Sequence, residues 1–161
     1  MSAVISPCQR YRYRLDRDVQ EEGFVIGYYG VNGSTAGEEE NDQTVRKWIG
    51  FTERIGGRKF VVGNPFAFRS TDVKYLAKVD DPVGPLNAHH LREIIRDADM
   101  HVPCWGNRDK VPKPLRYHFD MLTDLLFASG KPIWTFGFTQ SGDPMHPLML
   151  PYDVQMVEWV R

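Results

Sequence analysis

Four short apolar runs, separated by helix-like patterns, constrain the fold of this 161-residue chain more than any other feature. Each run is almost continuously apolar, which is typical of central strands covered on both faces; the runs are residues 24–29, 58–62, 100–105 and 132–138. The segments between them repeat apolar side chains at helical spacing, over residues 42–54, 87–98 and 117–128. Strands that alternate with helices form βαβ units. The sequence therefore predicts an α/β fold, a three-layer α/β/α sandwich with a mainly parallel central sheet of about four strands.

The segment before the first apolar run predicts an additional, antiparallel edge strand. Residues 10–15 alternate arginine and tyrosine, so the arginines should share one face and the tyrosines the other. Two interpretations stay open here: a solvated edge strand whose tyrosines pack inward, or a row of arginines that faces phosphate. At the other end of the chain, residues 154–160 are compatible with a last edge strand.

Each apolar run ends in a polar turn marked by glycine or proline. The first turn, residues 30–37, carries Asn32, Ser34 and Thr35, and the helix that follows it begins near Asp42. The later turns contain Asn64 to Arg69, Trp105 to Asn107 and Thr139 to His146. Ligands bind outside the carboxyl ends of the strands in open α/β sheets. We therefore expect the four turns to converge on one cleft, although the first turn by itself also fits an ordinary strand-to-helix connection.

The side chains in these turns suit recognition of a nucleobase. The polar candidates are Asn32, Ser34, Asp42, Asn64, Arg69, Asn107 and His146. Amide side chains offer one donor group and one acceptor, which match the edge of a base, and a histidine can donate to an oxygen that gains negative charge. A buried asparagine that ties down backbone and a histidine on a surface loop are the structural alternatives for Asn64 and His146.

Asp42 and Arg46 lie about one helical turn apart, so both side chains can face the same side of the helix. We expect this pair to brace the first turn.

Composition and motifs exclude several other functions. The net charge of −1 and the pI near 6.5 give no overall basic field for nucleic acid. The apolar runs are too short to span a membrane, and two cysteines fit a reducing compartment without a zinc site. We expect a single cytoplasmic domain over residues 1–161, whose oligomeric state the sequence leaves open.

Metal and cofactor chemistry is not expected. His89 and His90 are neighbours on a helix and make a poor chelate, and His101 and Cys104 lie on opposite faces of a strand. The chain has no phosphate loop of the G-x-x-x-x-G-K-[ST] type and no G-x-S-x-G elbow.

The turns together resemble a family of small bacterial and phage proteins known as a domain of unknown function, DUF1643. Its pattern runs N-P-S-T-A, N-D-P-T-x-R, V-N-x-F-A-x-R-x-T-D, D-P-V-G-P-x-N, W-G and G-L-T-x-x-G-x-P-x-H-P-L-x-L-P. The corresponding segments here are 32–36, 41–46, 63–72, 81–87, 105–106 and 137–151. Gly33 and Gln43 stand where that pattern has proline.

The order of the motifs is also similar to the uracil-DNA glycosylase superfamily. That resemblance implies that Asn32 positions a water molecule, that Asn64 reads the base and that His146 stabilises the departing base. The late motif here is His146-Pro147-Leu148 and lacks the serine of that superfamily, and no basic loop that would enter DNA is evident.

The functional hypothesis is an enzyme that binds a nucleobase, nucleotide or nucleic acid and hydrolyses an N-glycosidic bond. Its catalytic residues would be Asn32, Asp42 and His146; its substrate-binding residues would be Ser34, Thr35, Asn64, Phe66, Arg69, Trp105 and Asn107, with Phe66 or Trp105 stacking on the base. The alternative is a non-catalytic nucleotide- or nucleic-acid-binding module on the same fold.

Overall fold

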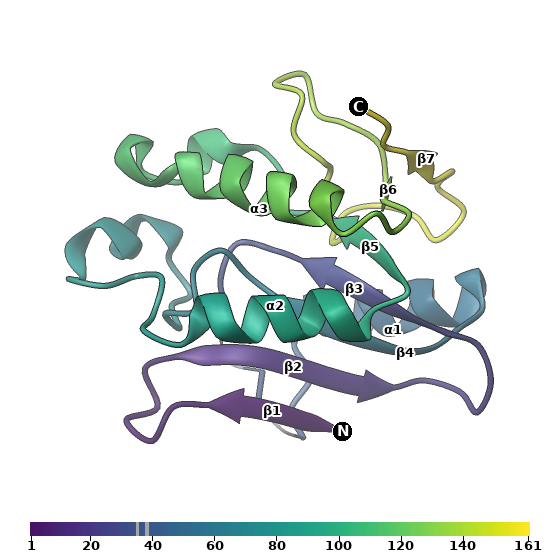
Figure 1. The fold of residues 1–161 in the computed structure, drawn as a ribbon, viewed down its shortest axis with the longest axis horizontal. Helices are drawn as coiled ribbons and strands as arrows, with labels where there is room; N and C mark the ends of the chain where they lie inside the picture. The colour runs from purple at the N-terminus through teal and green to yellow at the C-terminus, as the bar shows by residue number, and fades with distance from the viewer. Residues whose placement is uncertain (35, 38) are drawn as a thin grey trace.

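A mixed five-stranded sheet forms the centre of the molecule, a computed structural model that describes residues 1–34, 36–37 and 39–161 (Figure 1). The strand order is β1-β2-β4-β3-β5. The strands are β1 (Ser2–Ile5), β2 (Arg12–Asp18), β3 (Phe24–Tyr29), β4 (Gly57–Gly63) and β5 (Met100–Pro103). β3, β4 and β5 are parallel, whereas β1 and β2 add two antiparallel strands beside β4. The predicted α/β class is therefore confirmed, but the sheet is mixed rather than mainly parallel.

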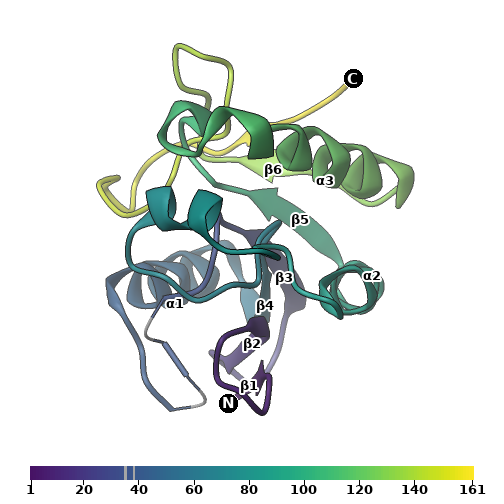
Figure 2. The ribbon, with the colours of Figure 1, turned by 90° about the vertical axis from the view of Figure 1, so that its left-hand side faces the viewer.

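Three α-helices cover both faces of this sheet: α1 (Gln43–Ile55), α2 (Asn87–Asp97) and α3 (Tyr117–Ala128). Figure 2 shows α1 on one side of the strands, and α2 and α3 on the other. Two buried apolar clusters reflect this arrangement. One joins α1 to the sheet through residues such as Trp48 and Phe60, and the other joins α2 and α3 through residues such as Ile94 and Leu126.

Short 3-10 helices and a second, two-stranded sheet complete the structure. The 3-10 helices are η1 (Val73–Lys78), η2 (Arg108–Lys110) and η3 (Lys113–Leu115); the small antiparallel sheet consists of β6 (Trp134–Thr135) and β7 (Val157–Glu158). None of the helices in the described part of the chain is long and apolar enough to cross a membrane.

The chain leaves β3 and β4 toward opposite faces of the sheet. β3 continues toward α1, whereas β4 continues through η1 toward α2 before β5 pairs on the far side of β3. Connections that diverge in this way leave a crevice at the carboxyl ends of adjacent strands. Asn32 and Phe66 prolong β3 and β4 by one parallel bridge beyond their ends, so both exits begin close together.

Two strand predictions are wrong. The strand predicted over residues 10–15 is β2, but β1 pairs with it and takes the edge position; four residues are too short to give a readable alternation in the sequence. Residues 132–138 do not form a fourth central strand. Ile133 makes one parallel bridge to His101, and then Trp134–Thr135 pair with β7 instead. An apolar run has the same appearance in a strand and in a packed extended segment.

The expected division of arginines and tyrosines in the opening strand is also wrong. The register of β1 against β2 shifts between Val4 and Ile5, where their partners are Arg14 and Arg12. A bulge of this kind changes the alternation of side chains. Arg12 accordingly donates to the carbonyl of Ala36 near α1, whereas Arg14 forms an ion pair with Asp97 at the end of α2.

Candidate functional site

A cavity of about 250 Å³ opens at the carboxyl ends of β3 and β4, between the two diverging chain exits. Three segments that are distant in sequence form most of its wall: the turn after β3, the turn and η1 after β4, and the start of α1. Its lining residues are Arg12, Gly30, Val31, Asn32, Ser34, Asp42, Thr44, Trp48, Asn64, Ser70, Thr71, Val73, Lys110 and His146. Asn32, Ser34, Asp42, Asn64 and His146, all identified from the sequence, thus come together in one pocket.

Asn64 contributes an amide that no protein group occupies. The residue is only 3% exposed, and its side chain has no hydrogen-bond partner in the described part of the chain, although its backbone carbonyl accepts from Asn87 Nδ2 at 2.8 Å. Gly30 lies directly against this side chain, since a Cβ at position 30 would come within 3.0 Å of Asn64 Oδ1. Because a buried amide without a partner costs free energy, this group is set up to receive donors and acceptors from a ligand.

Asn32 mainly ties the first turn to the segment after β4. Its Nδ2 donates to the carbonyls of Gly33, Phe68 and Ser70 at 3.1, 3.2 and 2.9 Å. The donor half of the amide is therefore occupied by backbone. The acceptor, Oδ1, is the part of Asn32 that can hold a water molecule or a ligand group.

Asp42 is the N-cap of α1 and, among the described residues that line the pocket, the only carboxylate. Its Oδ1 accepts from the Val45 amide at 2.9 Å, and its Oδ2 accepts from Ser34 Oγ at 3.2 Å. The expected pairing with Arg46 is wrong, since the ion pairs of the described residues include none between these two side chains and Arg46 is exposed. Ser34 and the helix end brace this turn instead, because a carboxylate at an N-cap meets free amides and the positive end of the helix.

His146 is held in a neutral form that donates from Nε2. Burial lowers its pKa to about 4, and Lys110 lowers it further while Asp42 acts in the opposite direction. Its Nδ1 accepts from the Leu148 amide at 3.2 Å, which leaves the proton on Nε2. Nε2 has no partner among the described residues and remains accessible at the pocket wall.

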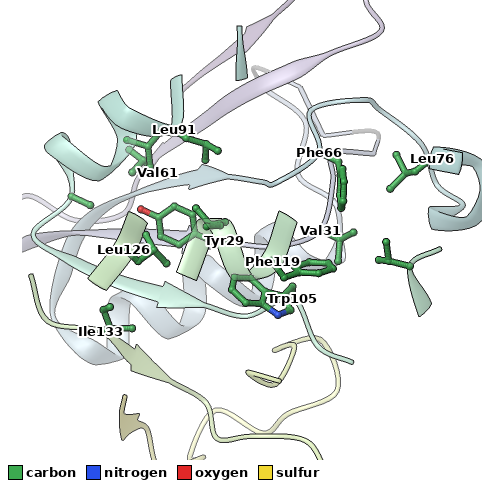
Figure 3. Close-up of a cluster of buried hydrophobic side chains, with 14 of the residues drawn as sticks. Tyr29, Val31, Val61, Phe66, Leu76, Leu91, Trp105, Phe119, Leu126 and Ile133 are labelled. Carbon is green, nitrogen blue, oxygen red and sulfur yellow. The ribbon is translucent and has the colours of Figure 1, made fainter. Parts of the chain in front are cut away.

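Two aromatic residues expected to stack on a ligand are in the core instead. Phe66 and Trp105 are both fully buried, and Figure 3 shows them in the same apolar cluster as Phe119. Trp105 packs against Phe119 with a ring-centroid separation of 5.2 Å, and Phe66 packs against it at 5.9 Å. Trp48 of α1, which lines the pocket, is the aromatic residue in the wall that the sequence did not indicate.

Two further predicted residues, Arg69 and Asn107, are not among the residues that line the pocket. Arg69 donates from Nε to the carbonyl of Ser34 at 3.1 Å and so supports the first turn from behind. Asn107 is exposed and caps η2 through the amide of Asp109. Thr35 falls outside the residues that the structure describes.

Two cations of the pocket were not among the predicted site residues, although one of the two interpretations of the arginine row in residues 10–15 was that it faces phosphate. Arg12 belongs to β2, and Lys110 ends η2 in the basic, proline-punctuated loop after β5. Lys110 lies beside His146: a Cβ on Gly106 would come within 3.1 Å of Lys110 Nζ and 3.3 Å of His146 Cβ. Desolvation lowers the pKa of the Lys110 ammonium. The basic character of residues 108–114 was a signal for such a group, although it did not indicate which cation enters the pocket.

No group of three or more His, Cys, Asp or Glu side chains within the described residues could hold a metal ion. The two cysteines are free, Cys8 being exposed and Cys104 buried.

The chain belongs to a family of proteins of unknown function, DUF1643, whose model matches residues 12–148. The match includes the sheet from β2 to β5, the three α-helices and every residue of the pocket wall. Comparison with curated proteins gave no match, and neither did comparison with solved structures.

Proposed function

We propose that the pocket binds the nucleobase of a nucleoside, nucleotide or nucleic acid and that the protein hydrolyses the N-glycosidic bond of this substrate. The observation that carries the proposal is the pairing of a buried, unoccupied amide, Asn64, with a neutral histidine, His146, that has an accessible Nε2 proton in the same cavity. The similarity of the motif order to the uracil-DNA glycosylase superfamily supports the same function and a related three-layer fold.

The size of the cavity also favours a compact ligand. At about 250 Å³ it is smaller than the roughly 300–1,000 Å³ of most pockets for drug-sized ligands. A single base fits this description better than a dinucleotide. A base within a duplex would have to rotate out of the stack to enter.

In the proposed reaction the C–N bond between the sugar carbon and the base breaks, and the base takes the bonding electron pair. A water molecule forms the new C–O bond at the sugar carbon and gives up its proton. Asp42, with Asn32 Oδ1 nearby in the same wall, is the group that can orient this water and accept that proton. His146 Nε2–H stabilises the negative charge on the departing base, and Asn64 holds the edge of the base throughout.

The direct test is release of free base from nucleosides, nucleotides and DNA, including modified pyrimidines. We expect His146→Ala to slow turnover by about a hundredfold or more, the typical loss when one such donor is removed, while Asn64→Ala weakens substrate binding. The matched controls are His89→Ala, on the exposed side of α2, and Asn107→Ala, at the cap of η2. Both should retain activity.

Two results would contradict the proposal. If His146→Ala and His89→Ala lost base-release activity to the same extent, His146 would have no specific role in the reaction. Tight binding of nucleotides without release of base from any substrate would identify the protein as the alternative, a non-catalytic nucleotide-binding module.

A further inference from the structure

Arg12 is a buried cation whose hydrogen-bonding capacity is mostly unused. The side chain is only 4% exposed and lines the pocket. Within the described residues the guanidinium makes one hydrogen bond, in which Nη1 donates to the carbonyl of Ala36 at 2.9 Å. Arginine carries five N–H donors in a rigid fork, so most of this fork has no partner among the residues that the structure describes.

The environment of Arg12 does not neutralise its charge by contact. None of the ion pairs in the described residues includes Arg12. Burial lowers the pKa of its guanidinium to about 10; Asp42 opposes this effect through space, whereas Arg69 and Arg17 reinforce it. Arg12 therefore stays protonated at neutral pH in a region where buried charges are normally paired.

Arg17, on the same strand, shows how a buried arginine is satisfied when its role is structural. Its guanidinium donates to Asn41 Oδ1 and to the backbone carbonyls of Asp16, Ser2, Gly37 and Glu40. All three nitrogens of the Arg17 guanidinium therefore donate hydrogen bonds, and several of these bonds stabilise the loop before α1. Arg12 lies beside the same loop but makes a single bond to it.

Gly33 provides the space in which the Arg12 side chain lies. A Cβ at position 33 would come within 2.9 Å of Arg12 Nε, 3.1 Å of its Cζ and 3.3 Å of its Cβ. The guanidinium consequently lies directly against the backbone of the turn after β3. A side chain at position 33 would displace it from the pocket wall.

The charged groups of the pocket wall favour an anion. Among the described residues that line the pocket, Arg12 and Lys110 are the two cations and Asp42 is the one carboxylate, while His146 is neutral. The ammonium group of Lys110 likewise has no hydrogen bond or ion pair within the described residues, although its backbone amide donates to the carbonyl of Asn107. The neighbourhood of Arg12 adds the guanidinium of Arg69, which acts on it electrostatically.

We propose that the Arg12 side of the pocket binds a phosphate group of the substrate, which makes the substrate a phosphorylated nucleoside rather than a free base or an unphosphorylated nucleoside. The planar fork of arginine matches two phosphate oxygens at once, and Gly33 keeps that fork in the wall. This inference rests on the proposed function, which supplies the nucleoside. The phosphate has two possible sources, a free nucleotide and the backbone of a nucleic acid.

The test compares binding of uridine 5′-monophosphate, uridine, inorganic phosphate and a single-stranded oligonucleotide by titration calorimetry. Wild-type protein should bind the monophosphate at least about tenfold more tightly than uridine, as expected for a charge-assisted contact. Arg12→Gln should remove this difference and leave the affinity for uridine unchanged. The matched control is Arg14→Gln on the same strand, whose partners are Asp16 and Asp97 and which lies outside this pocket.

Thermal unfolding separates ligand binding from a structural role. Loss of an unpaired buried charge should leave the melting temperature of Arg12→Gln unchanged or raised, whereas loss of a structural arginine would lower it. If Arg12→Gln does not fold, Gly33→Ala tests the same point, because it should weaken binding of the monophosphate by displacing the guanidinium while uridine still binds.

The outcomes distinguish this inference from the proposed function. Equal affinity of the wild type for uridine and its monophosphate would overturn the inference even if base release is observed. Preference for the monophosphate that depends on Arg12, without base release from any substrate, would support the phosphate site and refute the hydrolase. Tighter binding of the oligonucleotide than of the monophosphate, again dependent on Arg12, would identify nucleic acid as the source of the phosphate.

Discussion

Two buried histidines of this protein, His146 in the pocket and His101 in the sheet, have similar electrostatics but different surroundings. Burial lowers the pKa of each to about 4. His101 uses both ring nitrogens within the protein: Nδ1 pairs with Tyr29 Oη at 2.9 Å, and Nε2 pairs with Ser129 Oγ at 3.2 Å. His146 uses only Nδ1, through the amide of Leu148. A lowered pKa is therefore common to both histidines, and they differ in the second ring nitrogen, which His101 uses within the described residues and His146 does not.

Ser129, His101 and Tyr29 form a row of hydrogen-bonded side chains whose residue types would suit a nucleophile with its base. The direction of the hydrogen bonds excludes that role. Ser129 Oγ donates to the carbonyl of Leu126 at 2.6 Å. Its proton is thus committed to the backbone, and His101 Nε2 must act as the donor to Ser129. A histidine that already donates to the serine cannot take the serine's proton. We interpret this row as a structural network that ties β3 and β5 to the end of α3.

The largest expected effect is a difference between alanine substitutions of the two histidines: one should mainly reduce stability and the other should mainly reduce activity. His101→Ala should lower the free energy of unfolding by about 3 kcal/mol, because it opens a cavity and leaves Tyr29 Oη without its partner. His146→Ala should change stability much less and reduce base release instead. Chemical denaturation and the base-release assay, run on both variants, measure the two effects. The comparison fails if His101→Ala reduces turnover at unchanged stability.

The pH dependence of stability gives the next largest effect. In the unfolded chain both histidines take up a proton near their ordinary pKa of about 6.5, whereas in the folded protein they do so only near pH 4. The unfolded state therefore binds more protons between these values, and stability is complete above about pH 6.5 and falls as the pH approaches 4. The loss is up to roughly 3 kcal/mol for each histidine, since one pKa unit is worth about 1.4 kcal/mol.

Denaturation of wild type and His101→Gln across this pH range checks the prediction. The glutamine variant should show a shallower decline, because one of the titrating groups is gone. His90 and His118, whose pKa values are also lowered by burial, remain in both proteins and provide a common background. An unchanged slope would show that His101 titrates normally in the folded state.

The smallest expected effect concerns the far end of the His101 network. Ser129→Ala removes the acceptor of His101 Nε2 and should cost about 1 kcal/mol of stability, the usual net value of one such hydrogen bond. Substrate binding and turnover should stay unchanged, because Ser129 is not among the residues that line the pocket. A loss of turnover in Ser129→Ala with stability retained would reverse the interpretation and make this row a second site.

Much of the fold could be predicted from patterns that are local in sequence. The predicted helices over residues 42–54, 87–98 and 117–128 match α1, α2 and α3 within a residue or two. The predictions failed where the position of a segment depends on the strand that pairs with it. β1 is a strand because β2 offers it a free edge, and residues 132–138 leave the central sheet after one bridge because β7 pairs with β6. Neither partner choice is encoded in the segment itself.

The sequence by itself determined that Asn32 and Asn64 lie in the polar turns after β3 and β4 and that His146 lies in the later turn after residues 132–138, because strand direction fixes where each turn emerges. Only the tertiary structure decided which side chains of these turns face the pocket. Phe66 and Trp105 are drawn into the apolar cluster with Phe119, since burial of large aromatic rings outweighs their position at strand ends. Arg12 enters the pocket from a distant strand because a bulge changes its side and Gly33 leaves room for its guanidinium. Such contacts depend on packing between segments that are far apart in the chain, and no local pattern reports them.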